Sequence, residues 1–271
     1  MKLREDQIER YSRQIILSNI GRKGQKKILN AKVLLIGAGG LGSPCALYLA
    51  SAGVGRIGIV DFDVVELSNL QRQIVHSTRT VGKPKVESAK ITLNGINPDV
   101  EIVAHNLRIT SKNILDIIKD YDIVVDGSDN FSTKYLVNDA CVLSNKPLSH
   151  GGIFKFDGQL TTILPNESAC YRCLFPDPPP LGLVPTGILG AVVGVIGTLQ
   201  ANEVLKFILG VGNLLSGKLL VFNALDANFR QVKIHKDLNC PICGDNPSIK
   251  ELMDYELFCS LKNNHTRIVK K

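Results

Sequence analysis

Three glycines that follow a short apolar run give the first pattern that could do chemistry. Gly37, Gly39 and Gly42 match the spacing G-x-G-x-x-G. Such a turn brings backbone N–H groups against phosphate oxygens, at the start of a helix whose dipole favours negative charge. Ser43 and Pro44 predict the N-cap and first turn of that helix. The pattern indicates a nucleotide site, although a loop that needs only close packing uses the same glycines.

An acid and two cations indicate which nucleotide is bound. Asp61 ends a second apolar run about 20 residues after the glycines, where an acid can bind a ribose hydroxyl. Arg72 and Lys85 come next in the chain, and Asp129 follows a third apolar run. Parallel strands end at one edge of a sheet, so these groups should meet there. The pyrophosphate of NAD can be held largely by backbone N–H groups, whereas a triphosphate carries more charge and usually requires Arg, Lys and a divalent metal. We therefore expect ATP with Mg²⁺ in preference to NAD.

Two Cys-x-x-Cys pairs give the second chemical pattern, Cys170 with Cys173 and Cys240 with Cys243. Four thiolates can hold zinc in a closed tetrahedral shell with no position left for water, so such a zinc is structural. The two pairs lie far apart in the chain, and the fold has to bring them together. A redox pair, two disulfides or four unligated thiols are the alternatives, and the presence of two pairs favours zinc.

Three further cysteines carry less information. Cys45 and Cys141 lie in apolar stretches, where packing in the core is expected, and Cys259 lies near the end of the chain. The odd total of seven cysteines and a charged first segment, unlike a secretory signal, indicate a reducing compartment. We therefore expect a cytoplasmic protein.

These chemical groups must be positioned by alternating strands and helices. Apolar runs at 33–36, 57–60 and 123–125 are each followed by a helical pattern, as parallel βαβ topology requires. Residues 4–17 predict a basic N-terminal helix before the first strand. We therefore expect an α/β fold with a Rossmann-like βαβ nucleotide-binding core.

Later segments predict antiparallel strands. Residues 153–163 predict a hairpin that turns on Asp157-Gly158, and residues 219–234 contain two more strand patterns. The sheet is therefore expected to be mixed and partly antiparallel.

Eight sequence strings point to a known family when taken together. They are RYSRQI, GAGGLGSP, DFDVVELSNLQRQ, GKPKVESA, DGSDNF, NDAC, CYRCLFPDPPP and CPICG. In combination they resemble the MoeB/ThiF/HesA family, the bacterial relatives of the ubiquitin-activating enzymes. The resemblance extends over residues 3–259.

The resemblance implies an adenylyltransferase that acts as a homodimer. Members of the family use ATP to adenylate the C-terminal glycine of a small ubiquitin-like sulfur carrier that ends in Gly-Gly, and they release pyrophosphate. The catalytic positions fall on Arg13, Arg72, Lys85 and Asp129, with Arg13 reaching the partner's site. The nucleotide positions fall on Gly37, Gly39, Gly40, Asp61, Asp63, Ser68, Asn69, Leu70, Gln71, Arg72, Lys85, Asp129 and Asn130. The reacting carboxylate is ionised at neutral pH, so no general base is required.

A single folded unit is expected over residues 1–271, because a chain with 44% hydrophobic residues can bury a large core. Within it we expect four parts. They are a helical arm at 1–30, an ATP-binding half at 31–145, a carrier-binding and zinc half at 146–244, and a tail at 245–271, with a weak helical pattern at 249–262.

One segment departs from the family. Residues 180–187 contain no cysteine, where many members carry one that takes the carrier as a thioester or joins in sulfur transfer. Adenylation itself uses no protein thiol. The resemblance therefore supports adenylation, and it gives no support for a covalent carrier intermediate.

Charge and hydropathy narrow the partners. A net charge of +7 favours anionic partners. The basic residues are scattered along the chain and do not form a cluster, so the sequence pattern does not favour nucleic acid as a partner. Residues 181–202 carry no charge, but a proline and five glycines suit a buried helix better than a membrane span. An NAD-dependent oxidoreductase, a carrier-binding scaffold without catalysis and a tRNA-modifying relative are the alternatives.

Overall fold

One mixed sheet forms the centre of the structure. The computed structural model describes residues 3–178 and 187–259, and within them eight strands follow the order β3-β2-β1-β4-β5-β6-β7-β8. Strands β1 to β5 pair in parallel, and β5 to β8 pair antiparallel, which confirms the predicted mixed α/β sheet. The strands are β1 (Lys32–Ile36), β2 (Arg56–Val60), β3 (Glu101–His105), β4 (Ile123–Asp126), β5 (Leu148–Phe154), β6 (Asp157–Ile163), β7 (Lys218–Asn223) and β8 (Asn228–Lys233).

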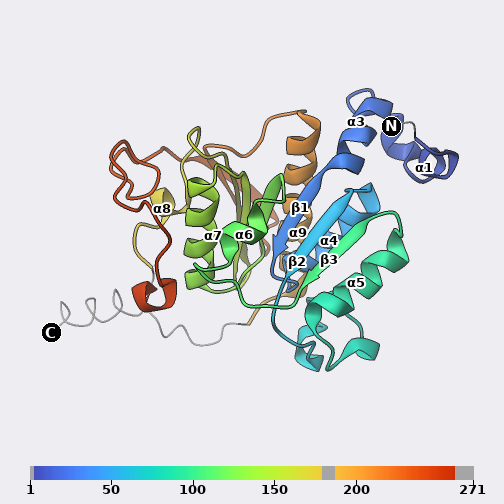
Figure 1. Cartoon of the computed structure of the whole chain (residues 1–271), viewed down its shortest axis with the longest axis horizontal. Coiled ribbons are helices and arrows are strands. Elements are labelled where there is room, and N and C mark those ends of the chain that lie inside the picture. Colours follow the sequence, from blue (N-terminus) through green and yellow to red (C-terminus); the bar gives the residue numbers. More distant parts are fainter. Residues whose placement is uncertain (1–2, 179–186, 260–271) are drawn as a thin grey trace.

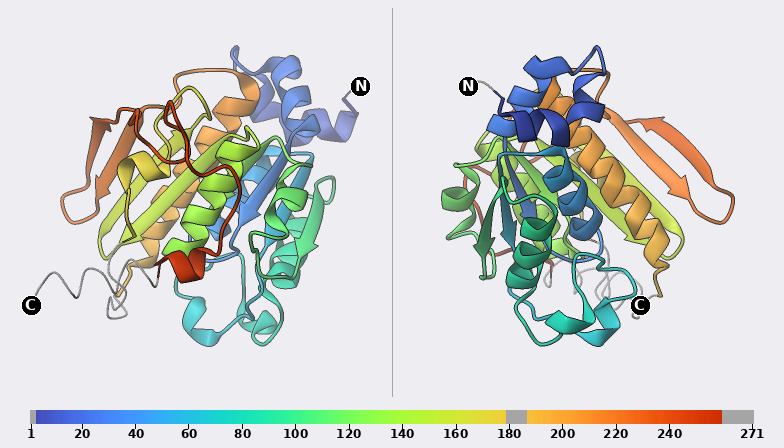
Figure 2. Two further views of the ribbon diagram at one scale, coloured as in Figure 1. Left: turned by 60° about the vertical axis from the view of Figure 1, so that its left-hand side comes forward. Right: turned by 90° about the vertical axis from the view of Figure 1, so that its right-hand side faces the viewer.

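Helices cover both faces of the parallel part of the sheet (Figures 1 and 2). Side chains of α4, α5 and α9 pack on one face of the sheet, and side chains of α6 and α7 pack on the other face. The helices are α1 (Glu5–Arg10), α2 (Ser12–Ile15), α3 (Gly21–Asn30), α4 (Gly42–Ala52), α5 (Lys85–Ile96), α6 (Ile114–Ile118), α7 (Phe131–Leu143), α8 (Tyr171–Leu174) and α9 (Gly190–Leu209), with 3-10 turns η1 (Leu67–Asn69) and η2 (Thr78–Thr80).

The central strands serve two cores at once. Val33 and Leu35 of β1 belong to the core under α4 and α9, whereas Leu34 and Ile36 belong to the core under α7. Successive side chains of a strand point to opposite faces of the sheet, so a strand buried on both faces reads as one continuous apolar run. The apolar run that precedes the glycines is therefore explained by its place in the middle of the sheet.

Helix α9 is buried against the sheet. By length and composition it is the one helix among the described residues that could cross a membrane, and half of its most apolar window is buried inside the protein. It packs against α4, β5 and β6, as a core helix does. The structure thus agrees with the expected buried helix, whose first predicted residues, 181–186, lie outside the described part of the chain.

The predicted N-terminal helix at 4–17 is wrong as a single element. The structure has two short helices, α1 and α2, with Tyr11 between them in a non-helical conformation. Tyr11 is buried, and its hydroxyl accepts a hydrogen bond from Asn97 Nδ2 at 2.9 Å. Burying this ring requires the chain to turn, and the periodic pattern gave no sign of it.

The predicted N-cap of the helix after the glycines is also wrong. Helix α4 starts at Gly42 with Leu41 as its N-cap residue, so Ser43 lies inside the first turn. The buried Ser43 hydroxyl has no hydrogen-bond partner among the described residues. Backbone N–H groups at this helix end are consequently free of a side-chain cap.

The hairpin turn lies two residues before the predicted position. Strand β5 ends at Phe154 and β6 begins at Asp157, so Lys155 and Phe156 form the turn. Lys155 adopts the left-handed conformation with a φ of 56°, which the sequence rule assigns to Asn or Gly. Asp157 is held in the sheet instead, where its Oδ1 accepts from Asn223 Nδ2 at 2.8 Å.

Near the C-terminus, only residues 255–259 are helical within the predicted stretch 249–262, whose last three residues lie outside the described part.

Candidate nucleotide site and cysteine cluster

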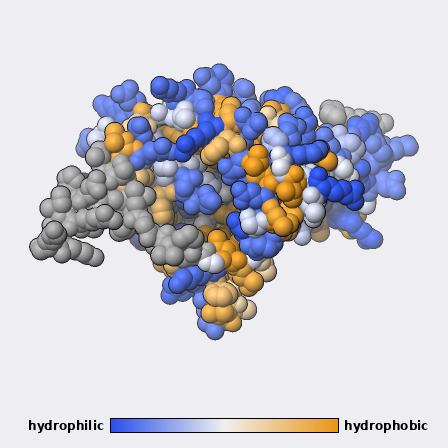
Figure 3. All heavy atoms as spheres, turned by 90° about the horizontal axis from the view of Figure 1, so that it is seen from below, coloured by the Kyte–Doolittle hydropathy of each residue, from blue (hydrophilic) through white to orange (hydrophobic). Residues whose placement is uncertain are grey.

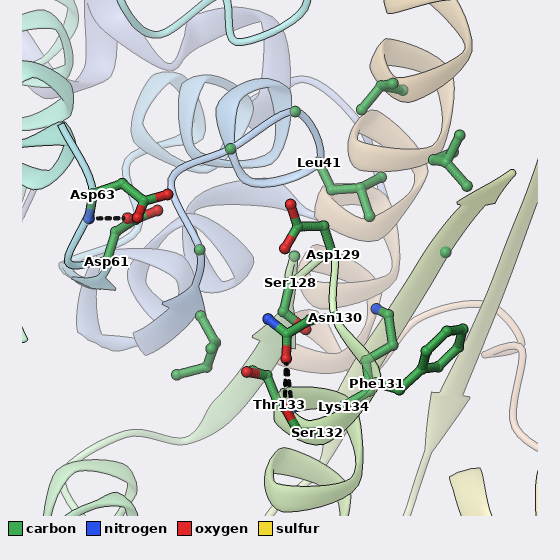
Figure 4. A pocket seen from close by; sticks show the side chains of 18 of the residues that line it. Leu41, Asp61, Asp63, Ser128, Asp129, Asn130, Phe131, Ser132, Thr133 and Lys134 are labelled. Atoms are coloured by element: carbon green, nitrogen blue, oxygen red, sulfur yellow. Dashed lines mark hydrogen bonds between the residues drawn. The ribbon is translucent and has the colours of Figure 1, made fainter. Parts of the chain in front are cut away.

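A cavity of about 900 Å³ opens where β1, β2 and β4 end (Figure 4). Ile36, Val60 and Gly127 mark the ends of these three strands in its wall. Carboxyl ends of parallel strands are the usual place for ligands in open α/β sheets, since the loops there diverge to opposite faces. Of the predicted site residues, this cavity brings together Gly37, Gly39, Gly40, Asp61, Asp63, Arg72, Lys85, Asp129 and Asn130.

The glycine turn is shaped by close backbone approach. Gly37 has a φ of 100°, which a residue with a side chain rarely adopts. A Cβ atom on Gly42 would lie 2.0 Å from the Gly37 carbonyl oxygen. The two glycines are therefore needed for the tight turn that joins β1 to α4.

Asp61 is fixed by the same turn. Its carboxylate accepts hydrogen bonds from the Ala38 N–H at 2.8 Å and from the Asp63 N–H at 2.9 Å, the second of which is drawn in Figure 4. Burial raises the pKa of Asp61, and the two N–H donors oppose that shift. The carboxylate is held at the end of β2, where it can accept one further hydrogen bond from a ligand.

The two predicted cations differ in their surroundings. Lys85, the first residue of α5, is buried, and its Nζ lies 2.8 Å from Asp63 Oδ2. Arg72 is half-buried, and its guanidinium donates to the Ser68 carbonyl at 3.2 Å. Both side chains line the cavity, so two positive charges face the same space as the glycine turn.

Asp129 and Asn130 lie in the loop between β4 and α7. Asp129 is exposed at the cavity wall. Asn130 is the N-cap of α7, and its Oδ1 accepts from the Thr133 N–H at 2.8 Å (Figure 4). Asp129 thus has a free approach to a ligand, whereas the Asn130 carbonyl oxygen is already used by the helix.

Five predicted residues are not among the described residues that line the cavity: Arg13, Ser68, Asn69, Leu70 and Gln71. Asn69 is buried, and its Oδ1 accepts from the Glu66 N–H at 3.1 Å, which closes the turn η1. Arg13 is exposed on α2 in the N-terminal arm. Its predicted role in a partner's site concerns a second subunit.

A buried charge cluster beside the cavity was missed at the sequence level. Asp126 Oδ2 lies 3.0 Å from Lys134 Nζ and 2.8 Å from His150 Nδ1. Lys134 Nζ also donates to the Gly151 carbonyl at 2.9 Å. Burial would raise the pKa of Asp126, but Lys134 and His150 hold it well below its usual range. Burial and the charge of Lys134 lower the pKa of His150, and the hydrogen bond to Asp126 opposes that shift.

This cluster joins three elements that the sequence separates. Asp126 ends β4, Lys134 lies in the first turns of α7, and His150 lies in β5. Lys134 follows the DGSDNF string closely, and that proximity was the available signal. His150 gave no signal, because only the parallel pairing of β4 with β5 places it opposite Asp126.

The four predicted zinc ligands come together in space. The Sγ atoms of Cys170, Cys173, Cys240 and Cys243 all lie within 4.8 Å of one another. Individual separations are 3.9 Å for Cys170 to Cys173, 3.7 Å for Cys170 to Cys240 and 3.4 Å for Cys173 to Cys243. Disulfide sulfurs lie about 2.05 Å apart, so the pairs are not bonded. Four sulfurs at these spacings fit a tetrahedral zinc site.

A mixed Rossmann-like sheet, a glycine turn at its centre and a four-cysteine cluster define the structural class of the chain. Comparison of sequences gives the family within that class. The sequence model of the ThiF family matches residues 11–242, and the chain belongs to this family.

Two relatives are similar to nearly the whole of this chain. It is 53% identical over 266 residues to the adenylyltransferase and sulfurtransferase MOCS3 of Aedes aegypti, covering 96% of this chain and 61% of that protein. It is 48% identical over 271 residues to the sulfur carrier protein adenylyltransferase of Thermus thermophilus, covering 97% of this chain and 100% of that protein. The chain thus spans about three fifths of the first relative and the whole length of the second.

Solved structures of E. coli MccB share the fold. The crystal structure of MccB with ATP has a TM-score of 0.77 and 27% identity, covering 87% of this chain and 75% of that chain. The structure of MccB with AMPCPP and MccA has a TM-score of 0.79 and 26% identity, covering 90% and 76%.

Proposed function

We propose that this chain is an ATP-dependent adenylyltransferase that activates the C-terminal glycine of a ubiquitin-like sulfur carrier ending in Gly-Gly and releases pyrophosphate. The observation that carries the proposal is the convergence of Arg72, Lys85 and the glycine turn on one cavity, with Asp129 at its wall. The names of the Aedes and Thermus relatives and the ATP complex of MccB support it.

The proposed reaction joins two anions. A carboxylate oxygen of the carrier's last residue bonds to the α-phosphorus of ATP, the bond to the bridging oxygen breaks, and pyrophosphate leaves. The carboxylate is already ionised at neutral pH, so the protein has no proton to remove. Its task is to neutralise charge that grows on the phosphates, which Arg72 and Lys85 would do.

Each cavity residue then has a defined part in binding. Backbone N–H groups of the turn from Gly37 to Gly42 would hold phosphate oxygens at the start of α4. Asp61 would accept a hydrogen bond from the ribose. Asp129 would hold Mg²⁺, which supplies further positive charge to the phosphates.

The four cysteines would hold a structural zinc, as the spacing of their sulfurs allows. That zinc would fasten α8 to the distant segment around Cys240. A closed shell of four thiolates leaves no position for a substrate, so no step of the reaction involves it.

A homodimer would complete the site, with Arg13 entering the cavity of the partner subunit. Between residues 62 and 81, the part of the chain that carries Arg72, five apolar side chains are exposed: Phe62, Val64, Leu67, Ile74 and Val81. The face seen from below also carries apolar groups among hydrophilic ones (Figure 3). Such side chains suit a subunit interface.

The carrier's tail would enter from the antiparallel side. Beyond the glycine turn the cavity continues along Gly152, Ile153 and Gly158 of β5 and β6, and Val221 of β7. The β7–β8 hairpin projects from the body of the molecule next to this part of the cavity (Figure 2). An acidic carrier would suit the net charge of +7. We place the protein in the cytoplasm with this partner and assign no nucleic acid or membrane to it.

Exchange of labelled pyrophosphate into ATP tests the proposal. We expect exchange with Mg²⁺, ATP and a carrier ending in Gly-Gly, and none with the same carrier lacking its last glycine. The proposal would be contradicted by an exchange rate that is the same with and without the carrier's last glycine, or by carrier binding without any exchange. The second outcome would instead support a scaffold.

A further inference from the structure

The last described residues touch two functional features at once. Residues 255–259 form a short helical segment beside α7 (Figure 1), which we call the closing segment. Tyr255 and Cys259 are buried, at 4% exposure each. Glu256 and Cys259 line the nucleotide cavity. The closing segment is therefore a wall of the cavity made from the end of the described chain.

On its inner side, the closing segment is tied to a buried ion pair. Arg172 donates to Asp139 through Nε at 2.9 Å and Nη2 at 2.8 Å. The Tyr255 hydroxyl donates to the same carboxylate at 2.7 Å. The ring of Phe258 lies 4.9 Å from the Arg172 guanidinium. Buried charge-assisted hydrogen bonds of this kind fix geometry strongly.

Arg172 is also linked to the cysteine cluster through the backbone. It lies between Cys170 and Cys173 in the chain, on the short helix α8. Its guanidinium stacks on Tyr135 of α7 at 4.8 Å. A shift of α8 would move the arginine and, through Asp139, disturb the hydrogen bond to Tyr255.

On its outer side, the closing segment reaches the loop near Asp61. Glu256 forms an ion pair with Arg108, and the Arg108 guanidinium lies 5.4 Å from the centre of the Phe62 ring. Both charged side chains are exposed, so this pair alone holds the segment weakly. The inner contacts must therefore supply most of the order in this wall.

We propose that Tyr255 and Arg172 are positioning residues for the nucleotide, which couple the cysteine cluster to the cavity through Asp139. The inference rests on the proposed function. Loss of the inner contacts would loosen the closing segment, admit water to one side of the cavity and lower its affinity for ATP. Neither residue takes part in the chemical step.

The variant Tyr255→Phe tests this with a minimal change, because it removes one hydroxyl and keeps the ring. Losing a hydrogen bond to a buried charge corresponds to about a tenfold change in an equilibrium constant. We expect the Kd for ATP, measured by calorimetry, to rise by up to about tenfold, with zinc content unchanged. The rate of Cys259 alkylation, monitored by peptide mass spectrometry, should also rise by up to about tenfold.

Tyr48→Phe is the matched control, because Tyr48 is exposed on α4 and is not among the described residues that line the cavity. Tyr48→Phe should leave the Kd for ATP and the rate of Cys259 alkylation unchanged. Removing zinc with a chelator should weaken ATP binding in the wild-type protein and weaken it much less in Tyr255→Phe, since the coupling there is already broken.

Unchanged ATP affinity and unchanged Cys259 alkylation in Tyr255→Phe would overturn the inference. A wild-type protein that binds ATP without any pyrophosphate exchange would contradict the proposed function alone. A wild-type protein with no ATP affinity would overturn both.

Discussion

Arg72 and Lys85 face the same cavity, but only one of them is strongly held before a nucleotide arrives. Lys85 is buried and paired with Asp63, whereas Arg72 is half-buried and donates to one backbone carbonyl. An arginine with spare donors can form new hydrogen bonds to a phosphate as charge develops there. We therefore expect Arg72 to act mainly in the transition state and little in stability.

Replacing Arg72 by alanine should lower the rate of pyrophosphate exchange by about 100-fold or more, the usual effect of losing one preorganised donor. The melting temperature should stay close to that of the wild type. Arg79→Ala is the control, because Arg79 is exposed on η2 and is not among the described residues that line the cavity. Equal exchange rates in the two variants would contradict the role of Arg72.

His76 makes stability depend on pH. Its Nε2–H donates to the Ala38 carbonyl at 2.9 Å, and burial, with a smaller contribution from Lys85, lowers its pKa. The unfolded chain takes up the proton near pH 6.5, while the folded protein resists it. Stability is therefore complete above about pH 6.5 and falls below it, by up to about 1.4 kcal/mol per pH unit for one such histidine.

Urea unfolding at pH 7.5 and 5.5 measures this dependence. The loss of stability at the lower pH should be smaller in His76→Gln than in the wild type, by about 1 kcal/mol. The same loss in both proteins would show that His76 does not resist protonation.

Most of the residues predicted for the nucleotide site line the cavity, whereas the hydrogen-bond partners of these residues could not be predicted. The glycine turn, Asp61, Arg72, Lys85 and Asp129 stand in strings whose spacing is itself informative. Loop strings cannot show which side chains face the cavity: the Oδ1 atom of Asn69 closes the turn η1, and Asn69 is not among the described residues that line the cavity. His150 was missed because its contact with Asp126 depends on the pairing of two strands.

At the scale of elements, the junction of β1 with α4 controls the geometry of the site. A Cβ on Gly42 would lie 2.0 Å from backbone oxygen, whereas a Cβ on Gly95 in α5 would meet nothing within 4 Å. Substituting Gly42 and Gly95 by alanine therefore distinguishes a position where only glycine fits from one where glycine merely lowers helix stability.

Gly42→Ala should destabilise the protein by about 2–3 kcal/mol, since backbone has to move to relieve the overlap. It should also weaken ATP binding, because the same turn holds the phosphates. Gly95→Ala should stabilise by up to about 1 kcal/mol through helix propensity. Denaturant unfolding measures both effects. A neutral Gly42→Ala would mean that the turn is less tightly closed than described.

Element types were easier to predict than element ends. Strands β1, β2 and β4 are continuous apolar runs, and buried parallel strands have that pattern. The break at Tyr11 and the turn at Lys155 arise from tertiary contacts and strand register. Neither leaves a local pattern in the chain.

For the molecule as a whole, the proposed role of Arg13 requires two subunits. Arg13 is exposed and is not among the described residues that line the cavity of its own subunit. If it serves the partner subunit, each active site is built from two chains, and defects in different chains can be separated by mixing them.

Mixing Arg13→Ala with Arg72→Ala, each inactive alone, should restore pyrophosphate exchange to about a quarter of the wild-type rate. Random exchange of subunits makes half of the dimers mixed, and one of the two sites in a mixed dimer is intact. Sedimentation of the mixture should show a species with the mass of a dimer. No recovery in mixed dimers would contradict a shared site.

The cysteine cluster shows what sequence can predict at long range. The presence of two Cys-x-x-Cys pairs favoured one shared zinc ion over the alternatives, and that choice predicted that the two pairs meet in space. The buried Arg172–Asp139 pair next to them gave no such signal, since a single arginine in a sequence does not reveal a distant acid.

The proposed activity attaches AMP to the end of a small carrier protein. Intact-mass spectrometry of a carrier ending in Gly-Gly, after incubation with the protein, ATP and Mg²⁺, detects this product itself. We expect a carrier heavier by one AMP, formed only when the terminal glycine is present. A carrier of unchanged mass, with ATP bound and unconsumed, would contradict it.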